Sequence, residues 1–274
     1  LVETNADILI LWRKLIMRLM KRILSAAAVL ALSASLLVGC SSGTASSVPV
    51  SASSAAESTV SSVEETASSA VDENEAAAAQ LLNDLTGSYQ ELWPVILADE
   101  YKQTWLDDCT ALVGEDNAEA AFEKLSSMVT GDVYGEDAVK AYANGGGAYF
   151  CGFTNSLATL TFDGETSTIS GTDKDGNVLF SHTYHYIGME PVHGLYEFES
   201  DDADSGEFTY FFLAPDTSAE TYHIEFRYGS DAEALSQYDA GEYAYWVASG
   251  ISTDCDQTMI DNCIELFCTE NLAG

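Results

Sequence analysis

The period of the hydrophobic pattern changes at Gly147, and this change constrains the fold more than any other feature of the chain. Six short segments follow it, rich in aromatic or β-branched residues, with apolar residues often alternating with polar ones. This pattern is typical of β-strands, whose successive side chains point to opposite faces. The segments are 148–153 (AYFCGF), 157–162 (LATLTF), 178–188 (VLFSHTYHYIG), 194–200 (GLYEFES), 207–213 (EFTYFFL) and 221–228 (TYHIEFRY). At this spacing they predict an antiparallel sheet that is closed into a barrel or folded into a sandwich.

The residues before Gly147 follow a helical pattern instead. Strong helix formers begin at Glu75, the pattern breaks near Gly87, and apolar residues return over 92–96. Further helices are predicted at 117–129 and 136–143, each followed by glycine. A last helix, at 257–267, carries one apolar stripe. The predicted fold class is α+β and mainly β, with N-terminal helices, an antiparallel β-unit and a C-terminal helix.

A secretion signal precedes the folded part. Lys21 and Arg22 stand before a short apolar run that ends in Leu37, Val38, Gly39 and Cys40. A basic flank and a short apolar core are typical of a signal peptide and too short for a stable membrane span. The end of the run resembles the lipobox of bacterial lipoproteins, in which the cysteine becomes the N-terminus and carries membrane-anchoring acyl chains. An ordinary cleaved signal and a short transmembrane helix are the alternatives.

This resemblance divides the chain into four parts. Residues 1–19 are interpreted as an extension from a wrongly assigned gene start, and 20–39 as the signal peptide. Residues 40–75 contain serine, alanine and glutamate without aromatic residues, which predicts a disordered tether spanning about 30–35 Å. The folded domain is expected at 76–274. The predicted location is extracytoplasmic, with Cys40 as the lipidation site on the cell membrane.

The charge balance excludes one class of partner. Two acidic and five basic residues lie before Cys40, so 42 of the 44 acidic residues and five of the 10 basic ones remain after it. A surface this negative repels nucleic acid and enriches cations nearby. Nucleic acid is therefore not expected as a partner.

The cysteines do not form a recognisable metal motif. After Cys40 the chain holds an odd number of them, without a C-x-x-C pair, so a zinc–thiolate cluster is not expected. One or two disulfides remain open, and the pairing cannot be read from the sequence. The cysteines concerned are Cys109, Cys151, Cys255, Cys263 and Cys268.

Several motifs together resemble the ZinT/YodA family, whose members are extracytoplasmic zinc-binding proteins with a lipocalin-like barrel. The stretch 84–90 (DLTGSYQ) is similar to the opening of the family barrel. Ala214 and Pro215, the segment 223–225 (HIE), and Gly229 with Asp231 follow the order of its last strands. The resemblance covers 84–272 and implies a lipocalin-like (calycin) antiparallel barrel.

The resemblance also implies a metal site. In the family, two histidines of a His-x-His strand bind zinc together with a third histidine just before the Ala-Pro pair. Here His223 and Glu225 take the first two positions, and both are residue types that bind zinc. Phe211 takes the third position and cannot coordinate a metal. His185 is the candidate for the missing ligand, with His193 as an alternative, and the set is expected to meet at the barrel mouth.

A structural interpretation of the same residues stays open, with His223 hydrogen-bonded to Glu225 and Arg227 as a further ion partner. The family's disulfide is also absent, since its two positions are His182 and Ser200.

Two functions follow from these expectations. The leading one is a lipid-anchored, cell-surface protein that captures zinc or another divalent transition metal ion for the solute-binding protein of a zinc ABC transporter. The alternative is a lipocalin-like module for a small organic ligand, with the metal site lost. Catalytic motifs such as G-x-S-x-G and H-E-x-x-H are missing from the sequence, so an enzyme is not expected.

Overall fold

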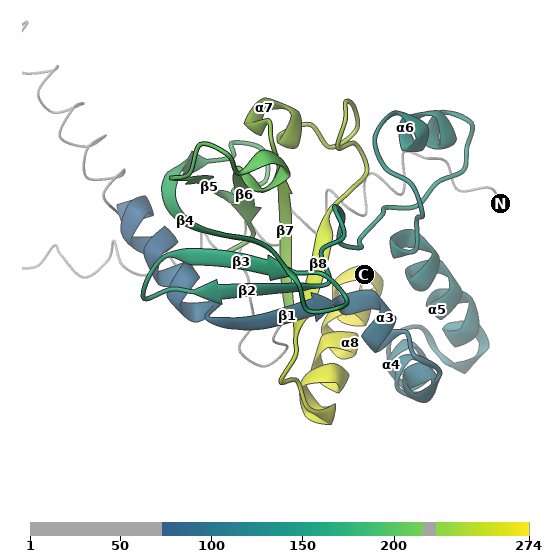
Figure 1. Ribbon diagram of the computed structural model, residues 1–274. Helices are drawn as coiled ribbons and strands as arrows, with labels where there is room; N and C mark the ends of the chain where they lie inside the picture. The colour runs from purple at the N-terminus through teal and green to yellow at the C-terminus, as the bar shows by residue number, and fades with distance from the viewer. Residues whose placement is uncertain (1–72, 216–222, 274) are drawn as a thin grey trace, which may run out of the picture.

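The computed structural model describes residues 73–215 and 223–273, shown in colour in Figure 1. The predicted signal peptide, the lipidation site Cys40 and nearly all of the predicted tether lie outside these residues. No helix in the described ranges is long and apolar enough to cross a membrane.

Eight antiparallel strands form a closed barrel, in which each strand pairs with the next along the chain and the last pairs with the first. This up-and-down order is the lipocalin arrangement, so the predicted fold class is confirmed. The strands are β1 (Gly87–Glu91), β2 (Thr159–Asp163), β3 (Thr168–Thr172), β4 (Val178–Met189), β5 (Tyr196–Ser200), β6 (Tyr210–Leu213), β7 (His223–Gly229) and β8 (Ala248–Ser252).

Five of the six predicted segments contain a strand, and the exception is 148–153. There Phe150 makes only isolated bridges, to Thr130 and to Trp246. Three strands are missing from the pattern-based prediction. β1 begins where the helical pattern breaks, in the stretch that the family resemblance had assigned to the opening of the barrel. β3 (TISGT) and β8 (ASGIS) are short and contain glycine instead of aromatic residues.

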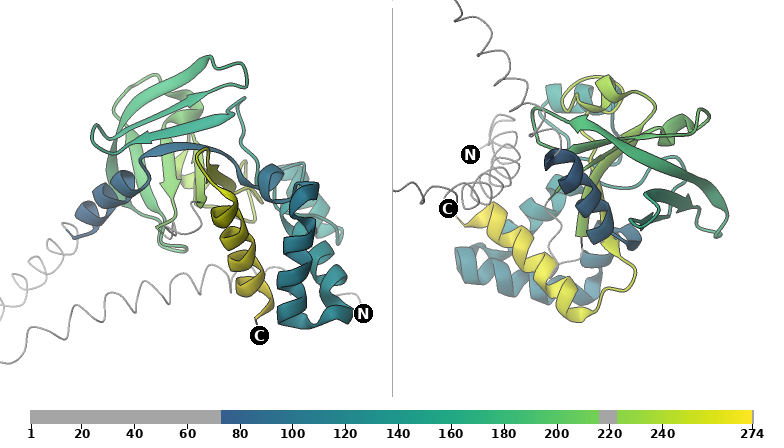
Figure 2. Two further views of the ribbon diagram at one scale, coloured as in Figure 1. Left: turned by 90° about the horizontal axis from the view of Figure 1, so that it is seen from below. Right: turned by 90° about the vertical axis from the view of Figure 1, so that its left-hand side faces the viewer.

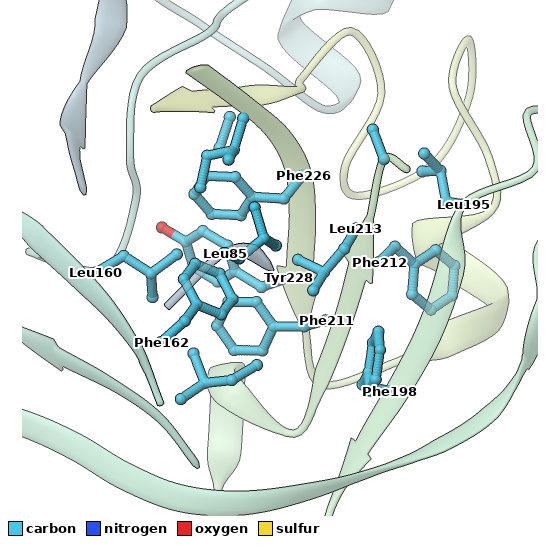
Figure 3. Close-up of a cluster of buried hydrophobic side chains, with 14 of the residues drawn as sticks. Leu85, Leu160, Phe162, Leu195, Phe198, Phe211, Phe212, Leu213, Phe226 and Tyr228 are labelled. Atoms are coloured by element: carbon cyan, nitrogen blue, oxygen red, sulfur yellow. The ribbon is translucent and has the colours of Figure 1, made fainter. Parts of the chain in front are cut away.

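Aromatic rings fill the barrel interior (Figure 3). The ring of Phe211 lies 5.4 Å from that of Tyr228 and 5.4 Å from that of Tyr184. At one end the hydroxyl of Tyr228 accepts a hydrogen bond from the backbone N–H of Thr154 at 2.6 Å and donates to the Thr154 carbonyl at 3.0 Å. The interior is therefore a packed core.

A helix over residues 73–84 leads directly into β1, and its apolar residues Ala78, Leu81 and Leu82 pack against the barrel core. It includes residues 73–75, which the sequence had assigned to the tether. The apolar run AAAAQLL extends the helix and provides the surface that the core covers.

Most other helices form a layer beside the barrel (Figure 2). They are α3 (Leu92–Ile96), a 3-10 helix (Asp99–Tyr101), α4 (Lys102–Val113), α5 (Glu115–Val129), α6 (Glu136–Ala143) and α8 (Gln257–Leu272). The short helix α7 (Ala232–Leu235) packs on the barrel instead, with Leu235 in the barrel core cluster (Figure 1). α6 has its predicted bounds, α5 begins two residues before the predicted 117, and α8 continues to Leu272 instead of ending at 267.

The helix α4 was not predicted, although half of its residues are apolar. Tertiary contacts stabilise it: Trp105 and Cys109 are buried in a second hydrophobic cluster with α5, α8 and the outer face of β8. The indole N–H of Trp105 also donates to the carbonyl of Ile96 at 2.7 Å.

Candidate functional site

His223 and Glu225 share one face of β7, as predicted, but this face is the outside of the barrel. The residues between and after them, Ile224, Phe226 and Tyr228, belong to the barrel core. His223 is opposite Ile251 of β8, which belongs to the helix-side cluster. Both side chains are half-buried. Their expected place in the barrel mouth is therefore corrected, because the strand gives its aromatic face to the interior.

Phe211 lies on the opposite side of the sheet from His223 and Glu225. It pairs with Tyr228 of β7, is fully buried, and stacks on Phe226 and Tyr228 inside the barrel. The three positions that the family resemblance assigns to one metal ion thus do not converge. A histidine at Phe211 would face aromatic rings, with the β-sheet between it and the two predicted ligands.

His185, the predicted third ligand, is held elsewhere. It lies on β4, which β5 and β6 separate from β7 in the barrel. Its Nδ1 is 2.7 Å from a carboxylate oxygen of Asp201, and about half of its side chain is exposed. Within the described ranges, no three His, Cys, Asp or Glu side chains form a group that could hold a metal ion. His223, Glu225 and His185 therefore do not form the expected site.

The alternative ligand His193 belongs to a buried structural cluster. The carboxylate of Glu190 is fully buried and accepts hydrogen bonds from the backbone N–H groups of Val192 and His193, and the His193 ring lies 3.2 Å from it. Burial acts to raise the pKa of Glu190, but the bonds from His193 and Val192 outweigh it and lower that pKa. The His193 ring also packs on Tyr238, with centroids 3.8 Å apart.

Arg227 binds backbone carbonyls where an ion pair was expected. Its guanidinium is fully buried, donates to the carbonyls of Leu235, Gln237 and Tyr243, and lies 4.3 Å above the ring of Tyr238. It thereby ties the segment after α7 to the outer face of the barrel.

Two buried thiols, those of Cys151 and Cys263, are influenced by the charge of Glu225. Burial, and then this charge, raises the pKa of Cys151 above its usual range and that of Cys263 to about 12. Both groups are therefore protonated thiols at neutral pH in the metal-free protein.

A cleft opens at the end of the barrel where β1 passes into α3. Its volume is about 320 Å³, and its walls are mostly apolar. The lining residues are Glu91, Trp93, Pro94, Leu97, Val129, Thr130, Gly131, Phe150, Cys151 and Gly152. A second cleft of about 250 Å³ shares Glu91 and Pro94 with the first. Glu91 therefore stands at the junction of two clefts.

The carboxylate of Glu91 is positioned by the crossing segment 150–154. Its Oε1 accepts a hydrogen bond from the backbone N–H of Phe153 at 2.6 Å. A Cβ atom at Gly152 would lie 2.9 Å from the same oxygen, so the glycine allows the close approach. Glu91 is the last residue of β1 and pairs with Gly250, which pairs in turn with Ile224 of the barrel core.

The sequence did not single out Glu91. It follows Tyr89 by two positions in YQELWP, a spacing that puts both on one strand face. Recognising a strand that continues past Gln90 would have been the signal, but the stretch similar to the barrel opening covered only 84–90 and the residues from 92 on were interpreted as helical.

No protein-family model matches this chain, and no curated protein does. Among solved structures it is similar to the Zn(II)-bound ZinT-like domain of Streptococcus pneumoniae AdcA, at 15% identity and a TM-score of 0.41 over 66% of this chain and 87% of that domain. It is also similar to Zn(II)-bound AdcA from the same organism, at 13% identity and a TM-score of 0.39. That match covers 67% of this chain and 34% of AdcA. Membership of the ZinT/YodA family stays a prediction.

Proposed function

We propose that this chain is a non-enzymatic, extracytoplasmic binding protein, tethered to the membrane through Cys40, that holds a small organic molecule in the cleft beside Glu91. The observation that carries the proposal is the composition of the cleft: aromatic and apolar walls around a single fixed carboxylate. Small-molecule sites typically combine an apolar lining with a few placed polar groups, at volumes from about 300 Å³. Because side chains fill the interior of the barrel, we expect the ligand to bind in the cleft at its end.

The lining also favours binding over catalysis. Its potential nucleophiles are Thr130 and Cys151, and Cys151 is buried with a raised pKa that keeps it a thiol. A nucleophile of this kind needs a base as its partner, but the thiol of Cys151 donates to the carbonyl of Tyr149, and Oε1 of Glu91 accepts from the backbone N–H of Phe153.

A fragment screen by ligand-observed NMR tests the site. Thr130 is exposed at the cleft, so a Thr130→Trp variant should fill the cleft and leave the core intact. We expect fragments that bind the wild type to lose binding in this variant. Thr166→Trp, in the exposed turn after β2, is the matched control and should leave binding unchanged. Fragments that bind both variants alike would place the site elsewhere and overturn the proposal.

Zinc capture, with delivery to a transporter's solute-binding protein, is a second candidate. The half-buried His223 and Glu225 on one face of β7 favour it, since both types ligate zinc. The described residues do not supply a third ligand, so the fit is incomplete.

Titration calorimetry of the tag-free protein with zinc chloride tests this candidate. It requires submicromolar binding that His223→Ala removes and His185→Ala leaves unchanged. Weak or absent binding, or binding that survives His223→Ala, would reject it.

A further inference from the structure

We infer that the ligand of the barrel-end cleft is a small organic cation, an ammonium group on an apolar body, held by Glu91. This inference rests on the proposed function and names the class of its ligand.

Glu91 has one carboxylate oxygen bound and the other available. Among the described residues its carboxylate has one partner, the N–H of Phe153, which binds Oε1. Oε2 is left to accept from a ligand. Because Oε1 is fixed, the carboxylate is already oriented toward the clefts before anything binds, which lowers the entropic cost of binding.

The negative charge of Glu91 has no basic side chain beside it in the lining of the two clefts, since neither is lined by a lysine, arginine or histidine. The few basic residues after Cys40 are used elsewhere: Lys102 pairs with Glu119, Lys140 with Asp137, and Arg227 binds carbonyls. Lys124 lies on α5, with an interaction of its own, and Lys174 lies in the exposed turn between β3 and β4. A bound cation therefore supplies the countercharge that the lining lacks.

The side chains of the cleft suit an organic cation better than a metal ion. Zinc and calcium each need several nitrogen, sulfur or oxygen donors, and Glu91 and Cys151 are the only His, Cys, Asp or Glu side chains among the lining residues. Its remaining walls include the rings of Trp93 and Phe150. Aromatic faces attract ammonium groups through their negative quadrupole, and the apolar side chains of Pro94, Leu97 and Val129 suit an attached hydrocarbon.

Calorimetry at pH 7 with phenethylammonium chloride and its neutral analogue 2-phenylethanol tests the inference. We expect phenethylammonium to bind the wild type, and Glu91→Gln to weaken it by at least about tenfold, the loss of a charge-assisted hydrogen bond. Binding of 2-phenylethanol should be weaker and equal in both proteins. Glutamine keeps an oxygen for the Phe153 N–H, so thermal melting should show both proteins folded.

Glu165→Gln is the matched control, because it removes the same charge from an exposed position after β2. It should leave phenethylammonium binding unchanged. Equal affinity of the two probes, no effect of Glu91→Gln, or no binding of phenethylammonium would each overturn the inference. The fragment screen with Thr130→Trp decides separately whether the cleft binds ligands at all.

Discussion

At the scale of the residue, the face to which a side chain points decides its role. His223 and Glu225 keep the predicted spacing but lie on the helix side of β7, whereas Phe211 lies inside the barrel. Glu91 lies at the barrel end, where the sequence had placed Glu225. Glu91, and not Glu225, is therefore the glutamate at the end of the barrel.

Phe211→His tests this geometry directly. If the three family positions converged, the substitution would restore a zinc site. Because the β-sheet separates position 211 from the other two, we expect unchanged zinc affinity by calorimetry. We also expect a loss of about 2–4 kcal/mol in the free energy of unfolding, since a polar ring enters an apolar core. Phe211→Leu, measured in urea, is the apolar control, and a gain in zinc affinity for histidine would contradict the structure.

Glu190 gives a pH-dependent contribution to stability. Its folded-state pKa is lowered, so the stabilisation is present above the unfolded pKa of about 4.3 and is lost as the pH falls through the folded value. We expect Glu190→Gln to destabilise the protein at pH 7 and to differ less from the wild type on acidification below about 4. Urea denaturation across this range measures the difference. A stability difference between the two proteins that grows below pH 4 would show instead that folding raises the pKa of Glu190.

At the scale of the element, α4 and α8 bring two cysteines together. The sulfur atoms of Cys109 and Cys268 lie 3.9 Å apart, both buried, although 159 residues separate them in sequence. Among the disulfide pairings that the sequence left open, the structure therefore favours Cys109 with Cys268. The structure itself shows both cysteines as free thiols.

We predict that a disulfide oxidant joins these two cysteines. Each thiol loses one proton and one electron, and one oxidised glutathione becomes two reduced molecules. Burial raises the pKa of both thiols, so the reaction should be slow, since thiolates attack disulfides. Once formed, the bond should stabilise the fold by about 2–4 kcal/mol.

Intact mass spectrometry after incubation with oxidised glutathione measures this outcome. The expected result is a loss of two hydrogens that Cys109→Ser prevents and Cys255→Ser does not. A bond that forms equally in Cys109→Ser would show that another pair reacts.

At the scale of the whole molecule, the barrel and the helical layer share strand β8. Its Ala248 belongs to the barrel core, whereas its Ile251 belongs to the helix-side cluster. Both hydrophobic cores therefore depend on the same strand, so a change in β8 should affect the packing of both. The clefts lie at this junction, between the barrel end and α3.

The acidic balance of the molecule predicts a salt effect. With 42 acidic and five basic residues after Cys40, repulsion between like charges opposes folding, and ions screen it. We expect the melting temperature at pH 7 to rise when sodium chloride is increased from about 0.05 to 0.5 M, over which the Debye length shortens. At pH 4.5, with the carboxylates partly protonated, the rise should shrink. A melting temperature independent of salt at pH 7 would contradict this account.

The sequence by itself determined the antiparallel β-unit, most of its strands and the bounds of α6, because period and glycine stops are local signals. Its pattern left a barrel and a sandwich open, and the family resemblance implied the barrel. It also determined that His223 and Glu225 share a face. Only the tertiary structure decided which face is the inner one, that β1, β3 and β8 close the barrel, and that Glu91 meets the segment 150–154. Alternation fixes which side chains point together, but contacts between residues far apart in sequence decide what they point at.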